Sequence, residues 1–147
     1  MLTVKEITID KGQFLNLLLI GDEQESMIRR YIDRSRLFIG HISGIPSACC
    51  AVTVEKDNMI EIKNLAVLPG HRRKGIGRAM LEHVESLFPG KSFQLGTGET
   101  PSTLRFYQTC GYHISHRIPD FFTDNYNHQI IEEGVRLRDM VYLRKNA

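Results

Sequence analysis

The stretch HRRKGIGRAM, from His71 to Met80, sets four cationic side chains around two glycines spaced G-x-G. Met80 and Val84 then follow at helical spacing, which predicts an amphipathic helix that begins within the stretch. The first turn of a helix has unpaired backbone N–H groups and about half a positive charge. Gly75 and Gly77 have no side chains that would cover those N–H groups. The stretch therefore predicts an anion site of the kind that binds phosphate.

Two common phosphate motifs do not fit these residues. A Walker-type loop needs Lys and then Ser or Thr after its last glycine, but Ile76 follows Gly75. A dinucleotide fingerprint needs a third glycine where this chain has Met80. A solvated basic turn, with glycines that serve only the backbone, is the remaining alternative.

Length and composition limit the class of protein. The chain has 147 residues with 24% charged and 41% hydrophobic residues, which predicts a single domain over residues 1–147. The net charge of +2 gives no general attraction for nucleic acid. No run approaches the ~18 apolar residues of a membrane span, and no signal-peptide pattern is present. We therefore expect a cytoplasmic protein with neither a membrane nor a nucleic-acid partner.

The three cysteines fit neither a disulfide framework nor a zinc spacing. Cys49 and Cys50 are adjacent, so they should point to opposite faces of a strand, and Cys110 stands alone. We expect reduced thiols and no metal site.

Hydrophobic period and turn residues predict an α/β chain of the mixed α+β class. Val4, Ile7 and Ile9 alternate in the first strand, and Gly21-Asp22 divides a leucine-rich segment into two helices. Ser43–Pro46 and Asp57-Asn58 are turn signals within an antiparallel meander. The expected strands are 2–9, 37–42, 47–55, 59–68, 92–95, 112–118 and 140–143, and the expected helices lie within 13–32, from Ile76 to Pro89, and over 101–110.

Two motifs give this chain a family resemblance. Val67-Leu68-Pro69-Gly70-His71-Arg72-Arg73-Lys74-Gly75-Ile76-Gly77 resembles the coenzyme A-binding segment of the GNAT superfamily of N-acetyltransferases, [RQ]-x-x-G-x-[GA] after a strand that ends in V-x-P. Phe106-Tyr107-Gln108-Thr109-Cys110-Gly111-Tyr112 is similar to the family's F-Y-x-x-x-G-[FY]. The resemblance extends over nearly the whole chain. It implies a three-layer fold with a central mixed, mostly antiparallel twisted sheet flanked by helices.

The resemblance also implies an activity, namely transfer of the acetyl group of acetyl-coenzyme A to an amine. The pyrophosphate would lie on backbone N–H groups from Arg73 to Arg78, and the pantetheine arm would pair with the strand Asn64–Val67. The N–H of Val67 would polarise the thioester carbonyl. The residues expected to bind the co-substrate are Leu65, Ala66, Val67, Arg72, Arg73, Lys74, Gly75, Ile76, Gly77, Arg78, Thr100 and Thr103. Thr100 and Thr103 stand where many members of the family have Asn and Ala, so the resemblance does not determine their contacts with the pantetheine arm.

The chemistry needs a proton donor for the leaving thiolate and a way to deprotonate the amine. Tyr107 stands at the family's usual acid position, and its alternative is a packing role beside Phe106. Glu61 lies on the strand that leads to the glycine loop, which resembles the place of the catalytic Glu in histone-type members. Its alternatives are a strand carboxylate paired with Lys63, or a water chain that acts as the base instead. Three histidines, His71, His113 and His116, are further alternatives for the base.

The acceptor is the least determined part. The family builds its acceptor site from the first helix pair and the late strands, here Leu17–Tyr31 and Asp120–Arg138. The second segment combines carboxylates with aromatic rings, which suits a small cationic amine or a peptide amine. An insertion that packs against a second subunit, giving a homodimer, is equally consistent. A coenzyme A-binding regulatory module without turnover is the alternative to an enzyme, and a basic patch that binds nucleic acid is a third function.

Overall fold

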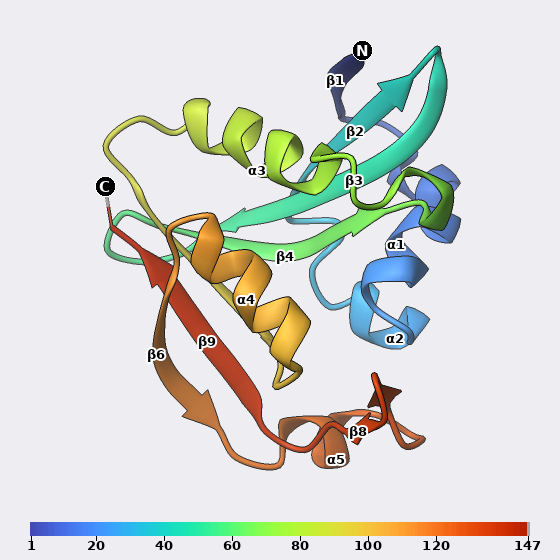
Figure 1. The fold of residues 1–147 in the computed structure, drawn as a ribbon. Helices are drawn as coiled ribbons and strands as arrows, with labels where there is room; N and C mark the ends of the chain where they lie inside the picture. The colour runs from blue at the N-terminus through green and yellow to red at the C-terminus, as the bar shows by residue number, and fades with distance from the viewer. Residues whose placement is uncertain (147) are drawn as a thin grey trace. The chain divides into compact units, whose positions relative to one another are not determined.

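The computed structural model describes residues 1–146, which fold as two compact units, unit 1 from Met1 to Lys91 and unit 2 from Ser92 onward. Helices and strands are mixed in both units, so the predicted mixed α+β class is confirmed (Figure 1). The prediction of one domain over the whole chain stays a prediction. Within the described residues no helix is long and apolar enough to cross a bilayer.

Unit 1 is a four-stranded antiparallel meander in the order β1-β2-β3-β4. Its elements are β1 (Leu2–Ile7), the 3-10 turn η1 (Lys11–Phe14), α1 (Leu15–Gly21), α2 (Glu25–Ile28), β2 (Arg36–Ile42), β3 (Ile45–Val54), β4 (Met59–Val67), the 3-10 turn η2 (Pro69–His71) and α3 (Ile76–Ser86). The predicted meander and the division of the first helical segment at Gly21-Asp22 are confirmed.

Side-chain alternation along the strands sends two sets of residues to opposite faces of this sheet. On one face Leu37, Ile39 and Cys49 pack with Leu18 of α1 and with Tyr31, which lies just beyond α2. On the other face α3 lies so close that a Cβ at Gly40 would be 2.7 Å from the Met80 sulfur. The fully buried pair Cys49 and Cys50 therefore divides between the two faces, and both thiols are free.

Unit 2 has a three-stranded antiparallel arrangement in the order β5-β9-β6 and a separate two-stranded hairpin. Its elements are β5 (Ser92–Gly98), α4 (Pro101–Thr109), β6 (His113–Ile118), α5 (Phe121–Asn125), β7 (Ile131–Glu132), β8 (Val135–Arg136) and β9 (Met140–Lys145). Phe122, Ile130 and Leu137 form a small core of their own within the polar 120–138 segment, which is therefore folded.

Three predicted boundaries are wrong. The first strand ends at Ile7, because Asp10 has a positive φ of 53° and begins a tight turn there. The first hairpin turn contains only Ser43-Gly44, both with positive φ, and Pro46 lies inside β3 opposite a register shift at His41. A proline is tolerated at such an irregular position because the ladder bond that it lacks is already broken. The fifth strand continues to Gly98.

Candidate functional site

The basic loop joins β4 to α3 with a sharp change of backbone direction. Arg72 is extended, Arg73 has a φ of 61°, and Gly75 has a φ of 74° as the N-cap of α3. Glycine adopts this left-handed conformation freely, whereas Arg73 accepts a strain of about 1 kcal/mol. Ile76 is buried as the first helical residue and fixes the start of α3 against the sheet.

The first turn of α3 presents backbone donors without acceptors. Gly75 supplies no side-chain cap. The carbonyl of Gly75 accepts from Ala79, but among the described residues no backbone bond from outside the helix takes the N–H groups of Ile76, Gly77 or Arg78. Such groups are satisfied by solvent or by a ligand, and the positive end of the helix dipole favours an anion.

Formal positive charge surrounds the same turn. The side chains of Arg72, Arg73, Lys74 and Arg78 are all exposed. Arg78 also forms an ion pair of 3.5 Å with Glu82 one turn later, and the Arg72 guanidinium donates a long bond of 3.4 Å to the Val67 carbonyl. The donors, the bare glycines and the cations together fit a pyrophosphate group, as the sequence predicts.

At the end of β4, alternate backbone N–H and C=O groups point to the side away from β3. The Leu68 N–H donates to the Ser47 carbonyl at 2.9 Å, and Val67 lies opposite Ala48 in the register. Successive residues of a strand point their backbone groups to alternate sides, so the N–H groups of Val67 and Leu65 point away from β3. An extended ligand could pair with them as an added strand. The Leu65 and Val67 side chains are half-buried, whereas Ala66 is buried in the core below the helix pair.

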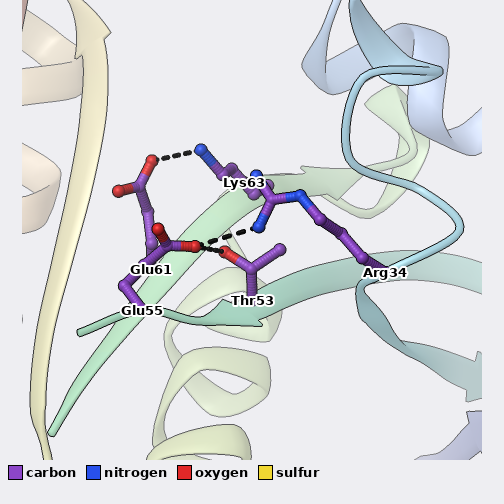
Figure 2. A network of polar contacts seen from close by, with 5 residues as sticks. All are labelled: Arg34, Thr53, Glu55, Glu61 and Lys63. Atoms are coloured by element: carbon purple, nitrogen blue, oxygen red, sulfur yellow. Dashed lines mark hydrogen bonds and ion pairs between the residues drawn. The ribbon is translucent and has the colours of Figure 1, made fainter.

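Glu61 lies earlier on β4 within a polar network. Its carboxylate accepts from the Lys63 ammonium at 2.5 Å, and the Glu61 side chain is only 7% exposed (Figure 2). Beside it, Glu55 accepts from the Thr53 hydroxyl at 2.6 Å and from the Arg34 guanidinium at 3.0 Å. The Thr53 bond, with help from Arg34 and the Lys63 charge, holds the pKa of Glu55 below its ordinary value. The pairing of Glu61 with Lys63, which the sequence left open, is present.

Unit 2 contains the remaining predicted residues. Thr100 is fully buried as the N-cap of α4, and its hydroxyl donates to that of Thr103 at 2.8 Å. Tyr107 is 9% exposed and its ring lies edge-on to those of Phe106 and Tyr112, at centroid distances of 5.0 and 6.0 Å. The Tyr107 ring is thus part of an aromatic cluster, as the packing alternative expected, and this leaves the role of its hydroxyl open.

The acids of the 120–138 segment differ in their surroundings. The Ser102 hydroxyl donates its one hydrogen to the Glu133 carboxylate, whose two oxygens lie 2.5 and 2.7 Å from it, so this carboxylate is held against α4. Asp120 and Asp124 make no side-chain hydrogen bond or ion pair with another described residue. The aromatic rings are used mainly in packing, because Phe122 contacts Phe121 and stacks on Tyr126 at 5.5 Å.

The side-chain contacts of one polar residue of β4 were not predicted from the sequence. Asn64 is 3% exposed and donates hydrogen bonds to the Leu18 carbonyl of α1 and to the Tyr31 hydroxyl, which lies just beyond α2. An asparagine in a run of strand residues is normally interpreted as a solvated position, so only its place next to Leu65 could have indicated it.

Comparison with known proteins agrees with this geometry. A family model described as an acetyltransferase (GNAT) domain matches residues 33–114. The uncharacterised N-acetyltransferase YvbK of Bacillus subtilis (strain 168) is 26% identical, with 97% of each chain covered. A GNAT family acetyltransferase from Elizabethkingia anophelis with acetyl-CoA bound is 27% identical, with a TM-score of 0.93 and 99% and 98% of the two chains covered. An IAA acetyltransferase from Bacillus cereus ATCC 14579 is 29% identical, with a TM-score of 0.91 and both chains fully covered.

We expect Gly77→Asp to weaken binding of acetyl-coenzyme A, because the carboxylate adds bulk and negative charge beside the free N–H groups of α3. Loss of one or two hydrogen bonds to a charged group, at about 1.5–3 kcal/mol each, corresponds to a dissociation constant raised about tenfold or more. Calorimetric titration measures the change. Gly12→Asp is the control, since no heavy atom lies within 4 Å of a Cβ there. Wild-type affinity in Gly77→Asp would contradict the assignment of the loop.

Proposed function

Because the chain belongs to the GNAT superfamily and is an acetyl-coenzyme A-dependent N-acetyltransferase, we propose that its acceptor is a small cationic amine or a peptide amine. The free amine would attack the thioester directly. The observation that carries this proposal is the pair of carboxylates at Asp120 and Asp124, which lie in a folded segment without side-chain partners among the described residues. A carboxylate attracts an ammonium group before the amine loses its proton.

The proposed roles follow the reaction. The N–H groups at the start of α3 and the surrounding cations hold the pyrophosphate. The outward N–H of Val67 donates to the thioester oxygen, where negative charge develops in the transition state. The Tyr107 hydroxyl protonates the leaving thiolate. Thr103 contacts the pantetheine arm, whereas Thr100, which is fully buried, acts through the hydrogen bond that it donates to the Thr103 hydroxyl.

The acceptor itself is tested by a screen. Release of free thiol from acetyl-coenzyme A is followed with polyamines, aminoglycosides, amino acids and peptides with a free N-terminus. We then expect Asp120→Asn and Asp124→Asn to raise KM for the best amine more than they lower kcat, since the ion pair is formed in both the ground state and the transition state. Glu133→Gln is the matched control, because that carboxylate already accepts from Ser102. Unchanged KM in both aspartate variants would place the acceptor elsewhere.

We expect Tyr107→Phe to lower kcat by about 10²–10⁴-fold, the usual contribution of a general acid, with little change in cofactor affinity. Tyr112→Phe removes a hydroxyl from the same aromatic cluster and should keep kcat within about twofold of the wild type. If kcat is the same in Tyr107→Phe and the wild type, water or another group protonates the leaving thiolate. Tyr107 then has only a packing role.

We propose Glu61 as the general base. The competing role of Glu61 is a structural ion pair with Lys63. If Glu61 is the base, Glu61→Gln lowers kcat and Lys63→Met leaves kcat within about twofold. If the pair is structural, either single change destabilises the fold because it leaves one buried partner alone, and the double variant recovers part of the loss. Chemical denaturation and kcat of all four proteins separate the two roles.

A further inference from the structure

One buried polar side chain hydrogen-bonds α1 and the segment after α2 to the strand that carries the proposed cofactor contacts. The Asn64 amide donates one hydrogen to the Leu18 carbonyl of α1, at 2.9 Å. It donates the other to the Tyr31 hydroxyl, just beyond α2, at 3.0 Å. Its oxygen receives a weaker contact from the Cys49 thiol at 3.7 Å. Both donors of this buried amide are therefore used inside unit 1.

The partners of Asn64 stay neutral, so the arrangement is not a charge pair. Burial raises the pKa of the Tyr31 hydroxyl well above its ordinary value, and burial also raises the pKa of the Cys49 thiol to about 12. A buried amide that loses a partner is left with an unsatisfied donor, which typically costs more than the bond itself contributes. The directions of the two bonds thus restrict where Leu18 and Tyr31 can lie.

The two helices are short, and the hydrogen bonds of Asn64 add a directional contact to the apolar packing of Leu18 and Ile28. The α1 helix has seven residues and α2 has four, and neither has a side-chain cap at its start. Helices of this length are marginal by themselves, so tertiary contacts must place them. The contact with Asn64 also needs Gly21, since a Cβ at that position would lie 2.1 Å from the Asn64 oxygen. Because glycine has no Cβ, Gly21 at the end of α1 allows the Asn64 side chain to come this close.

Asn64 is followed directly by Leu65, Ala66 and Val67. We propose that Asn64 is a positioning residue, which holds α1 and α2 at a fixed distance from this end of β4, so that binding of the pantetheine arm on β4 also orders the two helices. This inference rests on the proposed role of Leu65–Val67 in cofactor binding.

Hydrogen–deuterium exchange of the full chain, with and without acetyl-coenzyme A, tests the proposal without a known acceptor. In the wild type we expect the cofactor to slow exchange in residues 72–78 and also in residues 15–32. In Asn64→Leu, which keeps the shape of the side chain and removes its donors, protection of 72–78 should remain and protection of 15–32 should disappear. Tyr31→Phe keeps the bond to Leu18, so only the region around α2 should lose protection.

Asn64→Asp adds a readout that a purely structural role would not move. An ionised carboxylate cannot donate to the Leu18 carbonyl, whereas a protonated one can donate a single hydrogen. Burial at this position raises the pKa of the introduced carboxyl above its ordinary value, so cofactor-dependent protection of α1 should return as the pH falls from about 8 to about 5 in this variant only. Asn58→Asp, in the exposed turn before β4, is the matched control and should behave as the wild type at each pH.

The outcomes separate this inference from the proposed site. Equal helix protection in Asn64→Leu and the wild type would overturn it, and so would a wild type in which the cofactor protects 72–78 but not 15–32. A wild type without protection of 72–78 would instead overturn the cofactor assignment. Circular dichroism identifies variants that do not fold, and if Asn64→Leu is one of them, Tyr31→Phe and Asn64→Asp decide the question.

Discussion

The backbone N–H groups at the start of α3 are the constraint on which the rest of the site depends. They have no acceptor in their own helix, and the described residues outside it supply none. Glycine at the N-cap leaves them open, and the neighbouring cations raise the cost of leaving them without an anion. The direction of these donors is set by the backbone between β4 and α3, where Arg73 and Gly75 both have a positive φ.

Within residues 64–67, β4 presents side chains to the helix pair, side chains to the opposite face, and backbone groups to the side away from β3. Asn64 and Ala66 point their side chains towards the helix pair, whereas Leu65 and Val67 alternate with them. The backbone groups of Leu65 and Val67 are directed away from β3. A slip of one residue in the register would exchange both the side-chain faces and the set of N–H groups that point away from β3. The irregularity in the pairing with β3, between Ala51 and Val52, adds a residue to β4 before Asn64 and so helps to set this register.

The sequence predicted the parts whose signals are local. The meander, α3 and the helix before Gly111 follow from hydrophobic period and from turn residues such as Asp57-Asn58, both with positive φ. The 120–138 segment could not be predicted, because its core comes from Phe122, Ile130 and Leu137, which have no common period. The side-chain contacts of Asn64 could not be predicted either, because its two partners lie 46 and 33 residues away in the sequence. Local pattern locates a phosphate loop, whereas only the fold shows which buried polar group joins distant segments.

The polar network around Glu61 shows why a site residue and a structural residue are hard to separate on a strand. Removal of the Glu61 charge leaves the Lys63 ammonium, whose side chain is 22% exposed, without its partner at 2.5 Å. Lys63 also acts on Glu55, whose own bonds come from Thr53 and Arg34, so the change would extend to a second carboxylate. Glu61 can therefore take up a proton during a reaction only if solvent or substrate stabilises the positive charge of Lys63. A cationic amine that approaches Glu61 would therefore compete with Lys63 for one carboxylate, and the outcome of that competition decides between a base and an ion pair.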